Sequence, residues 1–200
     1  VSVSADSARV YVSRFITPRL PGEETATVQT TVGSTNHGGE VLVVNAASNA
    51  VASTIILKHS EALDTPTSAR GIPNYLGPVV ISPDGVNAWV PSKQDNVKRG
   101  TLRSGDGLTH DQAIRMIASR INLATGTEDL ASRVDYDNAG IPSTAAFDPR
   151  GVYLFTALEG SREIAVTDAF AHHEVLRITV QEAPQWLVIS PDGNTLFVHN

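Results

Sequence analysis

The six histidines of this 200-residue chain are the side chains whose types best suit metal binding or proton transfer. His37, His110 and His199, together with Asp106 or Asp111, have the donor types of a metal site, but nothing in their spacing requires one. His172 and His173 are adjacent, so their side chains point apart in an extended segment, and we expect them in a surface turn. We therefore predict no metal ligand.

A basic cluster is formed by Lys93, Lys98, Arg99 and Arg103 within a chain whose formal net charge is −6. Such a cluster could meet a carboxylate, a phosphate or an acidic partner, although lysines in loops are more often simply solvated. Further along, the segment "LEGSRE" is spaced to place a Glu–Arg pair at the rim of the fold. No nucleophile elbow, phosphate-binding loop, dinucleotide fingerprint or H-E-x-x-H motif occurs, so we predict no catalytic residue.

Composition restricts the classes of partner. The acidic balance, with a pI of about 5.4, argues against a nucleic-acid-binding surface, and no run of 18 apolar residues is present to span a membrane. The chain has no cysteine, which excludes disulfides, thiolate zinc sites and covalent c-type haem attachment within these residues. We therefore expect no cofactor in this segment.

The pentapeptide "ISPDG" occurs twice, and its setting recurs two further times. In each copy an apolar strand, a tight turn and a second apolar strand follow one another, with matched positions at Ser4, Ser82, Asp148 and Ser190. Proline presets the second turn position, Asp bonds back to the backbone, and Gly takes the left-handed conformation that closes a β-hairpin. Thr109 followed by Gln112 predicts one short capped helix outside this pattern.

A second strand pair follows each hairpin and aligns at Asn45, Asn122 and Asp168. The unit is therefore four antiparallel strands, A to D, and the interval from residue 148 to residue 190 matches the length of one propeller blade. We predict an all-β protein, a β-propeller of four-stranded antiparallel blades with about three and a half blades present as a partial ring. The expected blades are residues 1–58, 79–136 and 143–180, with a half blade over 184–200.

The "SPDG" hairpins and the strand "INLATG" resemble the YVTN-type β-propeller repeat over nearly the whole chain. The segments "WVPSKQDN" and "DNAGIPSTAAFDPRGVYLF" are also similar to propeller segments of large bacterial surface proteins, some of which carry a di-haem cytochrome c peroxidase-like domain. Because the half blade lacks its last two strands, we expect the chain to be part of a longer parent chain, or alternatively an open array of strands closed by another chain. The resemblance implies a periplasmic or extracellular, cell-surface location. It also leaves open haem c in another domain of that parent.

Long connections are expected at only one end of the blades: the B–C loops over 13–39 and 91–115, and the D–A connection over 58–78. Loops of this length are uncommon unless they bind, cover or position something. We therefore expect a non-catalytic binding or scaffolding module of a larger bacterial envelope or extracellular protein, which binds a protein domain or a small ligand at this face. The candidate binding residues are Arg14, His37, Lys93, Gln94, Asp95, Asn96, Arg99, Arg103, Glu159, Arg162 and His199. Two alternatives remain open at this point: the propeller domain of a c-type haem oxidoreductase, and a propeller lactonase.

Overall fold

The fold is all-β, as predicted from the sequence. The computed structural model describes residues 1–24, 38–65, 68–97 and 109–200. The first sheet has four antiparallel strands in chain order: β1 (Ser2–Val3), β2 (Arg9–Ser13), β3 (Gly39–Asn45) and β4 (Ala50–Leu57).

The second sheet also has four strand positions, but its inner and outer positions are each divided between two short strands. Both inner strands pair with β7, and both outer strands pair with β8. Its strands are β5 (Ile72–Asn74), β6 (Val80–Ile81), β7 (Asn87–Asp95), β8 (Ile114–Asn122), β9 (Thr127–Glu128) and β10 (Val134–Tyr136). The sheet thus begins at Ile72, earlier than the residue near 79 expected from the repeat.

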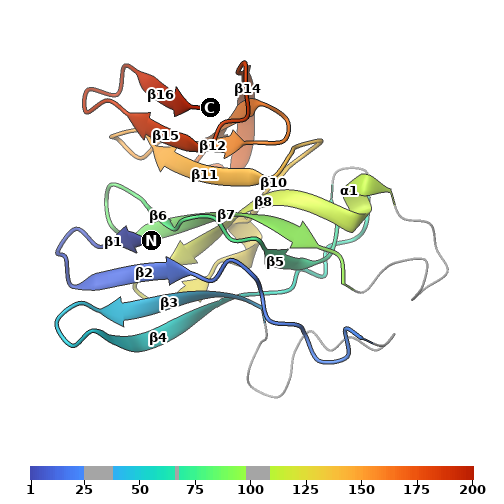
Figure 1. Ribbon diagram of the computed structural model, residues 1–200, viewed down its shortest axis with the longest axis horizontal. Coiled ribbons are helices and arrows are strands. Elements are labelled where there is room, and N and C mark those ends of the chain that lie inside the picture. The colour runs from blue at the N-terminus through green and yellow to red at the C-terminus, as the bar shows by residue number, and fades with distance from the viewer. Residues whose placement is uncertain (25–37, 66–67, 98–108) are drawn as a thin grey trace.

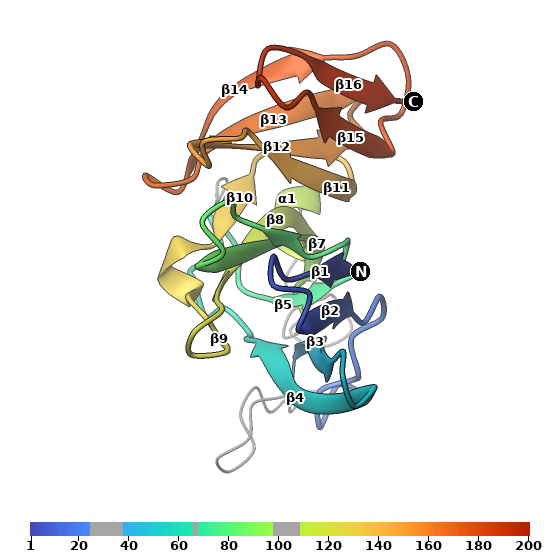
Figure 2. The same ribbon diagram turned by 90° about the vertical axis from the view of Figure 1, so that its left-hand side faces the viewer.

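The third sheet is again four-stranded, and a two-stranded hairpin follows it. The third sheet consists of β11 (Pro142–Phe147), β12 (Tyr153–Leu158), β13 (Glu163–Asp168) and β14 (His173–Thr179); the hairpin consists of β15 (Trp186–Ile189) and β16 (Leu196–His199). The sheets face one another in chain order, as successive blades of a partial propeller (Figures 1 and 2).

The repeated hairpin turn has the same backbone geometry in all four copies. The amide of Ser82 donates to the carbonyl of Asn87 at 2.9 Å, and its carbonyl accepts from Gly85, which has φ of 70°. The equivalent left-handed positions are Ser7, Gly151 and Gly193. In the third sheet the carboxylate of Asp148 accepts from the amide of Tyr153 at 2.7 Å, the role that a serine hydroxyl has in the other copies. The aligned positions are therefore equivalent in three dimensions.

The turns between the third and fourth strands also repeat. The side-chain oxygen of Asn45, Asn122 or Asp168 accepts from the two backbone amides two and three residues later, at 2.8–3.0 Å. In the last of these turns His172 takes the left-handed conformation, with φ of 57°, and lies in the turn as expected, whereas His173 is the first residue of β14. Because every turn of both kinds is short, the end of the molecule that carries them has little backbone beyond the sheets; it is the left side of Figure 1. We call it the turn end.

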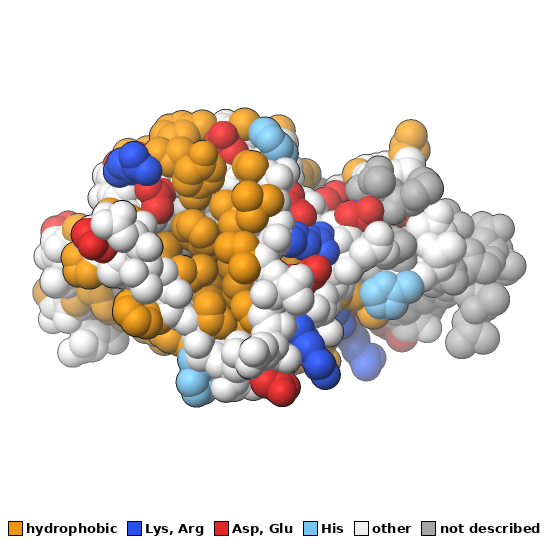
Figure 3. All heavy atoms as spheres, turned by 90° about the horizontal axis from the view of Figure 1, so that it is seen from above, with side chains coloured by type: hydrophobic (Ala, Val, Ile, Leu, Met, Phe, Trp, Pro, Cys, Tyr) orange, Lys and Arg blue, Asp and Glu red, His pale blue; other side chains and the backbone are white. Residues whose placement is uncertain are grey.

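Apolar side chains pack between successive sheets. In the first two sheets, the aromatic residue seven positions after the matched turn residue lies in this layer: Tyr11 is 3% exposed between the first two sheets, and Trp89 is 1% exposed between the second and third. The equivalent Phe197 is 60% exposed. It belongs to a broad hydrophobic side formed by strands β14–β16, which Figure 3 views face on. Its exposed apolar side chains include Leu176, Ile178, Trp186, Val188 and Phe197.

The opposite end, which we call the loop end, carries the longer connections that follow β2, β4 and β7. The connection between β2 and β3 has the expected bounds, whereas the connection between β7 and β8 is shorter than expected. Strand β7 continues to Asp95 and β8 begins at Ile114, so residues 91–95 are strand rather than loop. Between them, α1 (His110–Ala113) is capped by the hydroxyl of Thr109, which accepts from the amide of Gln112, as predicted. A single 3₁₀ turn, η1 (Leu130–Ser132), lies between β9 and β10.

Candidate binding site

The loop end contains an apolar groove with a volume of about 510 Å³, a size typical of small-molecule and peptide-segment sites. Its walls come from three sheets. Phe15 follows β2, residues 75–78 join β5 to β6, and Ile141 and Glu159 flank the hairpin of β11 and β12. Residues 75–78 and Ile141 adjoin β5, β6 and β11, whereas Phe15 and Glu159 follow the second strands of their sheets.

An aromatic pair forms one wall of the groove. The rings of Phe15 and Tyr75 meet edge to face with centroids 4.8 Å apart. Tyr75 has φ of 51°, an unfavourable conformation for a residue with a Cβ. It is held there because its amide donates to the side-chain oxygen of Asn74 at 3.0 Å, and because the next amide, that of Leu76, donates to the carbonyl of Phe15. A strained residue held by its surroundings in a groove is a feature of functional sites.

Lys93 contacts the aromatic pair and binds Asp95, and neither of these two residues lines the groove. The ammonium of Lys93 lies 4.1 Å from the centre of the Tyr75 ring, a cation–π contact, and 2.9 Å from a carboxylate oxygen of Asp95. The other oxygen of Asp95 accepts from the amide nitrogen of Asn74 at 2.8 Å. Both charges are thus neutralised within the cluster, and the two residues fix the position of the Tyr75 ring rather than projecting free charge.

Glu159 provides the charged group on the opposite wall. Its amide donates to the carbonyl of Ile141 at 2.8 Å, and its carboxylate is 3.4 Å from the side-chain amide of Gln185. The turn beneath it is closely packed, since a Cβ on Gly140 would lie 2.4 Å from the Cα of Gly160. The position of Glu159 therefore depends on two glycines.

The Glu–Arg pair expected in this turn forms elsewhere. Among the described residues, no ion pair joins Glu159 to Arg162, whose side chain is exposed and whose φ is 59°. Instead, Glu163 pairs with Arg177 of the neighbouring strand at 3.0 Å, and Arg177 also binds Glu174 at 2.8 Å. The pair is a cross-strand contact of the third sheet, not a feature of the rim.

Two further candidate residues lie near the groove without lining it. Arg14 pairs with Glu40 at 2.9 Å, and its side chain remains 55% exposed. His199 is the last residue of β16, and its carbonyl accepts from the amide of Gln185, the residue whose side chain approaches Glu159. Both are placed at the loop end.

Gln94 and Asn96 are directed inwards instead. Gln94 is 2% exposed; its side-chain nitrogen donates to the carbonyl of Ala69, and its oxygen accepts from Arg133, each at 2.8 Å. Asn96 is 8% exposed and donates to the carbonyl of Gln112 at 2.9 Å. These two side chains hold the protein together and do not face the groove. His37, Arg99 and Arg103 lie outside the described residues.

Gln94 is part of a buried ionic network that the sequence did not reveal. Arg133 donates to Glu128 at 2.6 and 3.1 Å and to the carbonyl of Lys58 at 2.7 Å. The second oxygen of Glu128 accepts from the amide of Lys58 at 2.6 Å. The side chains of Glu128 and Arg133 are 0% and 5% exposed. Because Lys58 follows β4, the network ties the first sheet to the second.

Ionisable groups with shifted pKa values lie away from the groove. Burial raises the pKa of Asp135, against the opposing effect of the nearby Arg115, and burial also lowers the pKa of His172 in its turn. Within the described parts of the chain, no group of three or more His, Asp or Glu side chains is placed to hold a metal ion. No helix in the same parts has the length and apolarity needed to cross a bilayer. The described walls of the groove provide apolar and aromatic surface and the carboxylate of Glu159, a combination suited to binding a ligand rather than to catalysis.

The residues that build the groove were not among the sequence candidates, apart from Glu159. Connections rich in Pro and Gly contain Phe15, Tyr75 and Ile141. Large apolar side chains in such connections are not part of a strand and so do not pack on the face of a sheet. Phe15 is 57% exposed and Ile141 is 46% exposed. Large apolar residues in such connections were the sequence feature that could have indicated the groove.

The fold is that of a partial β-propeller with an apolar groove at its loop end. No protein-family model matches the chain, and no curated protein is similar to it in sequence. Among solved structures it is similar to Kuenenia stuttgartiensis hydrazine synthase, with a TM-score of 0.69 and 17% identity over 99% of this chain and 54% of that one. It is also similar to a functionally unknown protein from Desulfotomaculum acetoxidans, with a TM-score of 0.55 and 16% identity over 99% of this chain and 47% of that one. The chain thus spans about half the length of each, and at these identities the likeness shows the fold alone.

Proposed function

We propose that this chain is a non-catalytic binding or scaffolding module of a larger bacterial envelope or extracellular protein, and that it binds its partner in the groove at the loop end. The groove itself carries the proposal. Phe15 packs against Tyr75, yet Phe15 and Ile141 remain 57% and 46% exposed on its walls, whereas the apolar residues of the first core cluster are buried between sheets. Exposed apolar surface in a groove is the usual mark of an interaction site.

The electrostatics of the groove favour a partner that carries a positive charge. Lys93 and Arg14, two cations at the loop end, are each paired with a carboxylate, so their charges are largely balanced. Glu159 has only a neutral amide as its hydrogen-bond partner among the described residues, so it keeps its charge. An apolar segment with a basic residue next to it fits this arrangement.

Membership of a larger protein is supported by the hydrophobic side over β14–β16 (Figure 3). Phe197 has the repeat position at which Trp89 is buried by the following sheet, yet it is 60% exposed. A surface with the residues of an inter-sheet contact is suited to a further sheet. Because no cysteine is present, covalent haem c would have to belong to another domain of such a protein.

The binding proposal is tested by selecting peptides from a random 12-residue phage library on the immobilised chain. Selected peptides are then measured by fluorescence anisotropy against the double variant Phe15→Ser/Ile141→Ser. We expect basic residues to be enriched beside apolar ones, and we expect affinity to fall by about tenfold or more, because two exposed apolar contacts are lost.

The matched control is Phe170→Ser, which removes a phenylalanine that is 74% exposed at the turn end. This variant should bind the peptides as the parent chain does. Peptides that bind both variants equally well, or that show no sensitivity to Glu159→Gln, would exclude the groove as the binding site.

A further inference from the structure

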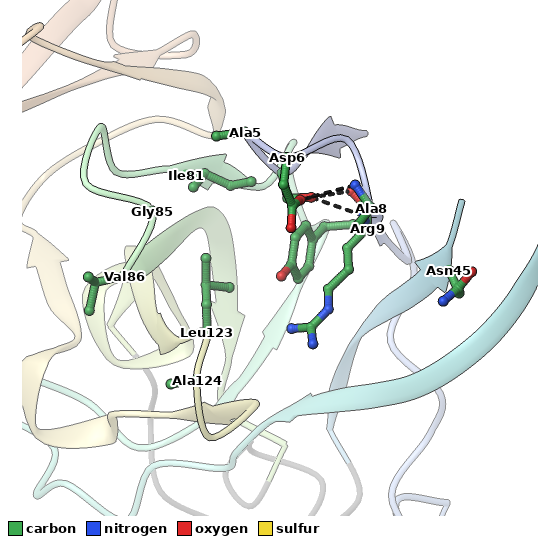
Figure 4. Close-up of a pocket in the computed structure, with 12 residues that line it drawn as sticks. Ala5, Asp6, Ala8, Arg9, Asn45, Ile81, Gly85, Val86, Leu123 and Ala124 are labelled. Carbon is green, nitrogen blue, oxygen red and sulfur yellow. Dashed lines mark hydrogen bonds between the residues drawn. The ribbon is translucent and has the colours of Figure 1, made fainter. Parts of the chain in front are cut away.

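The turn end contains a second cavity, between the first and second sheets, with a volume of about 660 Å³ (Figure 4). One side is formed by the first hairpin turn, including Asp6 and Arg9. The other side is formed by Val86 in the second hairpin turn and by Leu123 and Ala124 in the turn after β8. We call it the first cleft. It does not share residues with the groove at the loop end.

The repeat supplies an internal comparison, because the same position between the second and third sheets holds a cleft of only about 200 Å³. Two pairs of equivalent residues differ between the clefts. Ile81 in the first cleft corresponds to Phe147 in the second, and Ala124 corresponds to Phe170. The side chains at these two positions are smaller in the first cleft, although Leu123 there is larger than its counterpart Ala169 in the second.

The charged groups of the two clefts also differ. In the second cleft, Arg120 binds the carboxylate of Asp129 at 2.7 Å. In the first, Arg9 extends into the space bordered by Leu123 and Asn45, and its guanidinium has no ion pair among the described residues (Figure 4).

The neighbouring carboxylate is already used by the turn. One oxygen of Asp6 accepts from the hydroxyl of Ser4 at 2.6 Å and from the amide of Ala8 at 3.0 Å, and the same arrangement recurs at Asp84 and Asp192. Asp6 is therefore a turn residue shared by three of the four copies, whereas Arg9 has Asn87 as its counterpart in the second cleft.

We propose that the first cleft binds a small amphipathic carboxylate, whose acid group pairs with Arg9 and whose apolar body lies against Leu123, Ala124 and Ile81. The volume is within the range of small-molecule sites, and a guanidinium beside apolar walls matches a carboxylate joined to a hydrocarbon body. The site is independent of the function proposed for the loop end.

The test uses 4-phenylbutyrate and its neutral analogue 4-phenylbutanamide, titrated into the ¹⁵N-labelled chain and followed by NMR. We expect shifts at residues around the cleft, and tighter binding of the acid than of the amide. Arg9→Gln should weaken binding of the acid about tenfold and leave the amide unchanged, since the lost contact is charge-assisted. Ala124→Phe, which copies Phe170, should abolish binding of both compounds.

Arg150→Gln is the matched control, because Arg150 is an exposed arginine at the same end of the molecule and lines only the second cleft. It should leave both affinities unchanged. Equal affinity for acid and amide, an acid affinity that survives Arg9→Gln, shifts confined to the hydrophobic side over β14–β16, or no saturable binding would each overturn the proposal.

Discussion

Removing one partner of the buried network between the first two sheets should strongly destabilise the protein. In the variant Glu128→Ala, Arg133 stays buried, with a side chain 5% exposed, but loses the carboxylate that balances its charge. The amide of Lys58 also loses its acceptor. Breaking a buried ion pair on one side typically costs about 3–5 kcal/mol of unfolding free energy, and we expect a value in this range.

The assay is equilibrium unfolding in urea, followed by far-ultraviolet circular dichroism. With a slope of about 2 kcal/mol per molar urea, such a loss moves the unfolding midpoint down by roughly 2 M. The double variant Glu128→Ala/Arg133→Ala should cost less than the sum of the two single variants by about 1–3 kcal/mol, because the second change removes the unbalanced charge.

The matched control is Arg120→Ala, which breaks an ion pair of similar length, 2.7 Å, whose side chains are 23% and 37% exposed. This partly exposed pair should contribute only about 0–1 kcal/mol. If Glu128→Ala cost no more than Arg120→Ala, or if the two changes at the buried pair were simply additive, the network would not tie the sheets as we argue.

Three further outcomes are expected. Ser7→Gly should raise the unfolding free energy by about 0.5–1 kcal/mol in thermal unfolding, because Ser7 has φ of 57° and glycine adopts that conformation freely. Asp84→Asn should reduce the dependence of stability on pH in urea unfolding at acid pH. The hydrogen bond from Ser82 lowers the pKa of Asp84 in the folded state, so the stabilisation is present above the unfolded pKa of about 4 and is lost as pH falls through the folded value. Gly140→Ala should destabilise by about 1–3 kcal/mol and weaken groove binding, because its Cβ would meet the Gly160 backbone at 2.4 Å; unchanged binding would show that the turn of Glu159 is adaptable.

The turns could be predicted from the sequence because their chemistry is local. Proline, Asp and Gly in "SPDG" fix the hairpin within five residues, and the alignment extends to Asp148 because a carboxylate can accept the same amide that a serine hydroxyl accepts. The side-chain oxygens of Asn45, Asn122 and Asp168 likewise close their turns within three residues. No tertiary contact is needed to specify either turn.

The extent of β7 was not predicted in the same way, because the connection to β8 was expected to begin at Pro91. In the structure Pro91 lies inside the strand, opposite the interruption between β5 and β6. The amide of Gly77 donates to its carbonyl, so the nitrogen of Pro91 faces the same interruption, where no ladder hydrogen bond is required. A proline is tolerated there because the inner strand is divided at residues 75–79, which lie 12 to 16 positions earlier in the sequence.

The groove and the first cleft could not be predicted from the sequence for a related reason. Each is formed by residues from different sheets, and the repeat specifies only what happens within a sheet. Tyr75 has its position because Asn74, Phe15 and Lys93 surround it, and only Asn74 is a neighbour in sequence. The open volume beside Ala124 becomes meaningful only by comparison with Phe170 in the equivalent cleft.

The backbones at the two ends of the molecule are therefore under different structural constraints. At the turn end, every hairpin must satisfy the same few hydrogen bonds, so variation is confined to side chains such as Arg9 and Ala124 that project from a fixed backbone. At the loop end, the connections need only to leave one strand and return to the next, so their backbones differ from sheet to sheet. A rigid site for a small ligand is thus best built at the turn end, where the backbone is held by the motif. A groove that accepts a chain segment is best built at the loop end, where wall residues such as Phe15 and Ile141 come from connections of independent length and shape.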